Sequence, residues 1–73
     1  MNKSEKAAYI SKRAFELAQS GNFGRWIEIE FHLRHVEGFP EARQELDRRA
    51  TRDLLDQICA ESKQRAADNA HRT

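Results

Sequence analysis

Helix-breaking residues are scarce in this chain and stand only where one helical segment should give way to the next. The three glycines and the single proline are Gly21, Gly24, Gly38 and Pro40. Between them apolar residues recur at three- and four-residue spacing, and β-branched residues are sparse. Residues 26–31 end in a short alternating run, but that run lies inside a longer 3.6-residue pattern and has no partner strand. The sequence therefore predicts an all-α fold, a compact bundle of three to four short helices.

The first helix is expected over residues 4–19. Asn2 and Glu5 have the spacing of a capping box, in which each side chain accepts a hydrogen bond from the backbone N–H of the other residue. Ser4 is a second candidate cap. Gly21 then supplies the left-handed residue that commonly ends a helix. The apolar stripe of this helix is Ala7, Ile10, Ala14, Leu17 and Ala18.

A second helix is expected over residues 23–37, capped by Asn22 and ended by Gly38. This helix is apolar over a wide arc, which is typical of a central helix that contacts neighbours on two sides. We expect Trp26 at the centre of the core. The short turn into the next helix gives the bundle a helix-turn-helix-like centre. The two apolar stripes are Trp26, Ile29, Leu33 and Val36 on one line, and Ile27 and Phe31 on the other.

The second half of the chain holds one or two further helices. Pro40 and Glu41 are typical of the first turn of a helix. Thr51 can cap a new helix if the chain breaks near residues 49–51. The alternative is that the third and fourth helices are continuous. The apolar face of the last segment is Leu54, Leu55, Ile58 and Cys59.

The whole chain, residues 1–73, is expected to be one domain with its core within about residues 4–62. From residue 63 onward the apolar pattern thins, so we expect a frayed end over residues 63–73. The expected core residues are Leu17, Phe23, Trp26, Ile29, Leu33, Phe39, Leu46, Leu55 and Ile58.

Length and charge limit what such a domain binds. A chain of 73 residues buries only about 60% of its unfolded surface, which leaves little room for a deep pocket. We therefore expect no cofactor and no small-molecule substrate. Thirteen Lys and Arg residues against twelve Asp and Glu leave a net charge of +1, so we expect no partner that is held mainly by bulk charge.

The cysteine count and the first residues bear on location. Cys59 is the only cysteine, so no disulfide forms within the chain, whereas a secreted domain of this size is usually stapled by disulfides. No apolar signal-type run follows the charged start. No stretch approaches the roughly 20 apolar residues of a membrane-spanning helix. We expect a cytoplasmic protein that does not insert into membranes.

A set of apolar, turn and cap residues between about residues 14 and 60 resembles a known pattern. It comprises Leu-Ala-Gln-Ser-Gly-Asn-Phe at 17–23, Trp26, Ile29-Glu30 with Leu33, Gly-Phe-Pro-Glu-Ala at 38–42, Leu46, and Leu55 to Cys59. The chain thereby resembles a group of short bacterial helical proteins, often from proteobacteria or their mobile elements. The resemblance implies a helical fold and carries no activity with it.

The chain has few residues that are suited to catalysis or to metal binding. His32 and His35 stand three residues apart on one helix, and with Cys59 they form the best metal-ligand set. Cys59 falls on an apolar stripe, however, where a thiol is buried and inert. The chain lacks Cys-x-x-Cys, His-Glu-x-x-His and a glycine-rich loop, and we expect the Glu28 and Glu30 carboxylates to be solvated and ion-paired. We expect no enzyme, and a metal-dependent activity is the third hypothesis.

Arginines supply the second hypothesis, which is DNA binding. The second and third helices have the lengths of a helix-turn-helix. An arginine cluster on and after the third helix is suited to phosphate contacts. Acidic residues interleave with it, and acids that face a phosphate backbone are repulsive. The cluster is Arg43, Arg48, Arg49 and Arg52, and the acids are Glu41, Glu45 and Asp47.

Protein binding is the first hypothesis. Phe15, Ile27 and Phe31 lie off the main apolar lines of their helices, so a core this small leaves some of them at the surface. Such residues often seal a homodimer or a partner's groove. The sequence therefore predicts a non-catalytic interaction or regulatory module that binds another protein or itself.

Overall fold

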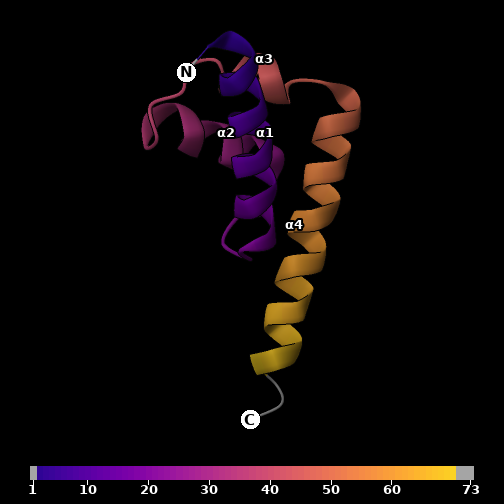
Figure 1. Ribbon diagram of the computed structural model, residues 1–73. Helices are drawn as coiled ribbons and strands as arrows, with labels where there is room; N and C mark the ends of the chain where they lie inside the picture. Colours follow the sequence, from indigo (N-terminus) through magenta and orange to yellow (C-terminus); the bar gives the residue numbers. More distant parts are fainter. Residues whose placement is uncertain (1, 71–73) are drawn as a thin grey trace.

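The computed structural model describes residues 2–70, and within them the chain forms four helices and no strand (Figure 1). The helices are α1 (Lys3–Gln19), α2 (Trp26–His35), α3 (Ala42–Leu46) and α4 (Arg49–Ala70). The predicted all-α bundle is confirmed. None of these helices combines the length and the apolar character of a membrane span.

The first helix begins and ends where the sequence predicts. The Asn2 side chain accepts a hydrogen bond from the Glu5 N–H at 2.8 Å, and Glu5 Oε2 accepts one from the Asn2 N–H at 3.4 Å. At the other end Gly21 has φ +82°, a left-handed conformation that side chains rarely adopt. A Cβ atom added at Gly21 would lie 3.6 Å from the backbone oxygen of Ser62, so the turn also packs closely on α4.

The second helix begins at Trp26, three residues later than predicted, and Asn22 does not cap it. The carboxylate of Glu28 takes over that role from inside the first turn. Its Oε2 accepts hydrogen bonds from the N–H of Gly24 at 2.5 Å and of Arg25 at 2.9 Å. An acid in this position satisfies N–H groups that have no partner within the helix.

Trp26 lies at the junction of α2 with α4, and the prediction that it is the centre of the core is wrong. Its backbone N–H donates a hydrogen bond to Asp56 Oδ1 of α4 at 2.8 Å, and the Arg52 guanidinium lies 5.6 Å from the centroid of its ring. As the first residue of the helix, Trp26 is half-buried at the edge of the core. The centre is held by Ile29 and Leu33, which are fully buried.

The third and fourth helices are separate, which settles the alternative that the sequence left open. The chain turns at Asp47, whose φ of −82° and ψ of 57° are those of an inverse γ-turn. The Arg48 N–H closes that turn on the Leu46 carbonyl at 2.9 Å. The break therefore precedes residues 49–51, and Thr51 lies inside α4 rather than capping it.

The last helix continues to Ala70, although the sequence analysis expected fraying from residue 63. Hydrogen bonds between neighbouring turns accompany this extension, from Gln64 to Asp68 at 3.2 Å and from Arg65 to Ser62 at 3.3 Å. The side chains of residues 63–68 are exposed, as the thin apolar pattern implies. Residues 71–73 of the expected frayed end lie outside the described residues.

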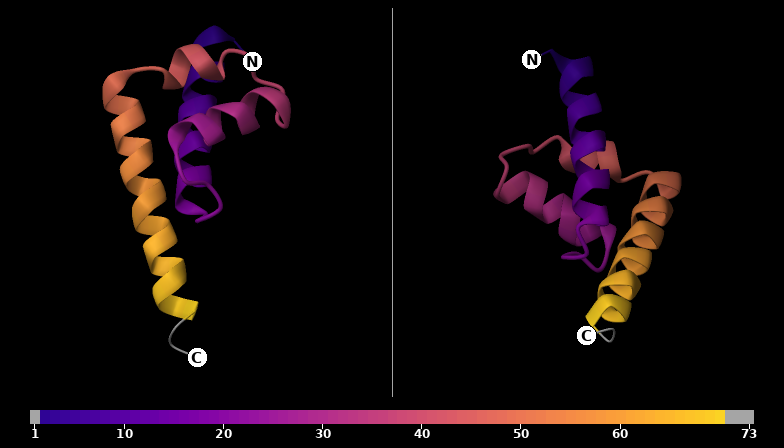
Figure 2. Two further views of the ribbon diagram at one scale, coloured as in Figure 1. Left: turned by 180° about the vertical axis from the view of Figure 1, so that it is seen from behind. Right: turned by 60° about the horizontal axis from the view of Figure 1, so that its bottom comes forward.

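The helices pack around one core. α1 and α4 lie side by side and run in the same direction (Figure 1). α2 crosses α1 steeply on the face that is turned toward the viewer in the left view of Figure 2. The short α3 bridges from the end of α2 to the start of α4. The buried core is Ile10, Ala14, Leu17, Ala18, Ile29, Leu33, Ala42, Leu46, Leu55 and Cys59.

Five of the nine predicted core residues are buried, and the other four pack against the edge of the core. The edge residues are Phe23, Trp26, Phe39 and Ile58. The prediction omitted three alanines, all of which are fully buried. The omitted core residues are Ile10, Ala14, Ala18, Ala42 and Cys59.

The burial of Leu33 predicts a large cost of truncation. Leu33→Ala should lower the free energy of unfolding by about 2–5 kcal/mol, because it deletes a buried side chain and leaves a cavity. Leu54→Ala, at a leucine that is 45% exposed, is the matched control and should cost less than about 1 kcal/mol. Urea unfolding followed by circular dichroism measures both. Equal losses in the two variants would contradict this assignment of the core.

Candidate functional site

The second helix carries apolar residues on two opposite faces. Ile29 and Leu33 point into the core and are fully buried. At about 100° per residue, Phe31 lies on the far side of the helix from both. Its side chain is 59% exposed, and Ile27, one turn earlier, is 47% exposed. Only one face of α2 is therefore used by the core.

The exposed face is a continuous strip. Ile27, Phe31 and His35 follow one another at four-residue spacing, and we call them the α2 outer face. The rings of Phe31 and His35 lie 4.4 Å apart between centroids at an angle of 42°. Ile27 and Phe31 are thus placed at the surface, as the first hypothesis requires. Phe15 is half-buried and packs against the core instead.

Charged residues flank the α2 outer face. Glu28 is exposed in the first turn, and Arg34 is half-buried in the last. The Arg34 Nη1 atom donates to Glu30 Oε1 at 2.8 Å. Glu30 is buried, so the expectation that it is solvated is wrong, although its ion pair with a neighbour one turn away is present. The signal for that pair was the four-residue spacing from glutamate to arginine.

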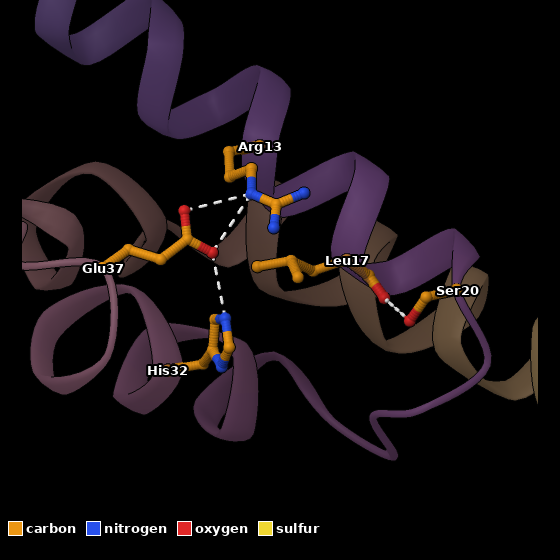
Figure 3. A network of polar contacts seen from close by, with 5 residues as sticks. All are labelled: Arg13, Leu17, Ser20, His32 and Glu37. Atoms are coloured by element: carbon orange, nitrogen blue, oxygen red, sulfur yellow. Dashed lines mark hydrogen bonds and ion pairs between the residues drawn. The ribbon is translucent and has the colours of Figure 1, made fainter.

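A polar network fixes the end of α2 against α1 (Figure 3). The Arg13 Nε atom of α1 donates to both carboxylate oxygens of Glu37 at 3.0 Å. On the other side, Glu37 Oε2 accepts a hydrogen bond from His32 Nε2 at 2.9 Å. The bond to Glu37 raises the pKa of the Arg13 guanidinium. The network was not predicted from the sequence, because Arg13 is 24 residues before Glu37 in the chain.

The three candidate metal ligands are not brought together. His32 bonds to Glu37, His35 lies against Phe31, and Cys59 is fully buried in the core. Among the described residues, no three His, Cys, Asp or Glu side chains form a group that could hold a metal ion. Burial raises the pKa of the Cys59 thiol, which keeps it protonated at neutral pH.

The four arginines of the second hypothesis do not share one environment. Arg43, Arg48 and Arg49 are exposed, whereas Arg52 pairs with Asp47 at 3.4 Å. The expected helix-turn-helix-like order of α2, turn and α3 is present. The α3 helix has only five residues, however, which is less than two turns. That is short for a helix that reads base edges in a major groove.

A shallow hollow of about 290 Å³ lies between the start of α1 and α3. An ion pair spans it, from Lys6 Nζ to Glu41 Oε1 at 3.3 Å. Both partners are partly exposed, so this pair contributes little to stability. The hollow is lined by Lys3, Lys6, Ala7, Ile10, Glu41, Gln44 and Glu45.

Comparison with known proteins found no matching protein-family model, no matching curated protein and no matching solved structure. The resemblance to a group of short bacterial helical proteins therefore stays a prediction.

The position of Cys59 predicts a thiol that reacts only when the protein opens. Burial raises the pKa of the Cys59 thiol in the folded state. The contribution of the neutral buried thiol to the free energy of unfolding is therefore fully present below the pKa that the thiol has in the unfolded chain, and it falls as pH rises through the alkaline range. At pH 8 an aromatic disulfide reagent should modify the native protein at least about a hundredfold more slowly than the urea-unfolded protein. Equal rates in the two states would contradict the burial of Cys59.

The Glu37 network predicts a localised loss of stability. Glu37→Gln should lower the free energy of unfolding more than its control does, because Arg13 loses a charged acceptor. Glu61→Gln is the control, since Glu61 is exposed and only accepts a bond from Gln57. Thermal unfolding followed by circular dichroism measures both. A control variant that loses as much as Glu37→Gln would show that the network adds nothing specific.

Proposed function

We propose that this protein is a non-catalytic cytoplasmic module that acts by binding another protein or a second copy of itself through the α2 outer face. The observation that carries the proposal is Phe31, an aromatic side chain 59% exposed on a helix whose reverse face is the core. Ile27 and His35 extend the exposed strip one turn in each direction. Residues at this spacing are those with which a helix engages a partner's groove or helix.

Single exposed apolar residues are common on protein surfaces and need no explanation. An exposed aromatic residue within a continuous strip is instead typical of an interaction site. Aromatic residues dominate the few positions that carry most of the energy of an interface. Burying an exposed phenylalanine contributes about 1.5–3 kcal/mol. Phe31 is the largest such residue on the outer face, so it is the natural anchor.

The outer face is also held in a fixed position before any partner arrives. Glu28 and Asp56 bond the backbone N–H groups at the start of α2, and Glu37 ties its end to Arg13. A surface that is ordered in advance loses less conformational entropy on binding. This supports docking by a preformed helix rather than folding on binding.

The other two hypotheses have less support. DNA binding through the arginine cluster would have to use the five-residue α3, while Arg52 already pairs with Asp47. A metal-dependent activity would have to use His32, His35 and Cys59, which lie in three different environments. The low reactivity expected of a buried thiol likewise favours a non-catalytic role.

Site-specific photo-cross-linking in the native cells tests the proposal. A photoreactive phenylalanine analogue at position 31 or at position 27 should trap the same protein, because both positions lie on one face. The analogue at Leu54, an exposed leucine of α4, is the matched control and should not trap it. Adducts that form equally from all three positions, or only from Leu54, would overturn the proposal.

A further inference from the structure

We propose that the protein which the α2 outer face binds is a second copy of this chain, with the two α2 helices antiparallel and crossing at Phe31. This inference rests on the proposed function and names its partner. Two independent features of α2 support it: the symmetric placement of the outer face about Phe31, and the complementary side chains of Glu28 and His35 near the two ends of the helix.

The placement is symmetric along the helix. α2 runs from Trp26 to His35, and Phe31 stands at its middle. Ile27 and His35 lie four residues to either side of Phe31, at angles of about 40° in opposite senses. A two-fold axis passing beside Phe31 therefore brings the whole outer face of one helix against the whole outer face of the other. An interface of this kind uses the same patch twice.

The polar side chains are complementary in the antiparallel arrangement. Glu28, an exposed acid, lies in the first turn of α2, and His35, whose imidazole can donate a hydrogen bond to a carboxylate, lies in the last. Antiparallel pairing places Glu28 of one copy within about 1.5 Å, measured along the helix axis, of the level of His35 of the other. A parallel arrangement would instead place Glu28 beside the second copy's Glu28. Antiparallel helix dipoles favour the same choice.

The side chains that form these contacts are already oriented. Glu28 is fixed by its bonds to Gly24 and Arg25, and His35 by its packing on Phe31. Seen from behind in Figure 2, α2 crosses in front of α1, and no other helix of the described residues lies over it. The outer face is therefore open to a helix that approaches along its length.

The size of the face indicates how tightly two copies associate. A standard interface takes about 800 Å² from each partner. That is a large share of the 5230 Å² that this chain exposes, and a ten-residue helix supplies only part of it. We therefore expect weak, reversible association, with a Kd on the order of 10 μM.

Sedimentation velocity over a hundredfold range of concentration tests whether two copies associate. The mass should rise from 8.5 kDa toward twice that value as concentration increases. Phe31→Asp should weaken association at least about tenfold. Leu54→Asp, which places the same charge at an exposed leucine of α4, should leave it unchanged. A dimer that Phe31→Asp does not weaken would overturn the proposal.

A second pair of variants tests the charge arrangement and does not depend on how Phe31→Asp folds. His35→Glu should weaken the dimer, because it sets an acid against Glu28 of the second copy. His35→Lys places a hydrogen-bond donor with a positive charge at the same exposed position and should associate at least as well as the original chain. Equal behaviour of the two variants would overturn the antiparallel arrangement.

Cysteine cross-linking tests the direction of the helices. The natural Cys59 is buried and does not compete. In the antiparallel dimer, positions 27 and 35 of different copies are neighbours, whereas each position lies about 12 Å along the axis from its own counterpart. A bismaleimide too short for that distance should join an Ile27→Cys chain to a His35→Cys chain when the two are mixed. Cross-links within either variant alone would show parallel pairing and overturn the proposal.

The outcomes separate this inference from the proposed function. A chain that stays at 8.5 kDa at every concentration overturns self-association. If positions 27 and 31 then still trap one different protein in cells and Leu54 does not, the α2 outer face keeps its role with another partner. If neither a dimer nor a position-specific adduct forms, both proposals fail.

Discussion

The arrangement of this protein depends on three carboxylates that hold one short helix at both ends. A ten-residue helix is marginal by itself in water, because few of its hydrogen bonds compensate the cost of its first turn. Glu28 and Asp56 accept hydrogen bonds from the backbone N–H groups that have no partner at the start of α2. Glu37 links the end of α2 to Arg13 of α1. With α2 fixed in this way, Ile29 and Leu33 reach the core while Phe31 is directed outward.

Much of the fold was predictable because its signals are local. The capping box at Asn2 and Glu5 and the left-handed glycines at positions 21 and 38 each need only a few neighbouring residues. The start of α2 was not predictable in the same way, because Asp56, the partner of the Trp26 N–H, lies thirty residues further along the chain. Local periodicity assigns a residue to a face of a helix, but it does not say which other element covers that face.

The same distinction explains the candidate site. Ile27 and Phe31 were predictable, because they stand off the stripe that faces the core on their own helix. Phe15 also stands off its stripe, yet it packs against the core. The histidines look alike in sequence and differ in space, where His32 bonds to Glu37 and His35 lies against Phe31.

The side-by-side packing of α1 and α4 sets the order of events when the chain is synthesised. Ile10 and Ala14 emerge from the ribosome more than forty residues before Leu55 and Cys59, which complete the same core. Until then the first three helices have no partner for that side of the core, and contacts between distant segments form slowly. The nascent chain therefore leaves this side of its core uncovered until α4 has formed.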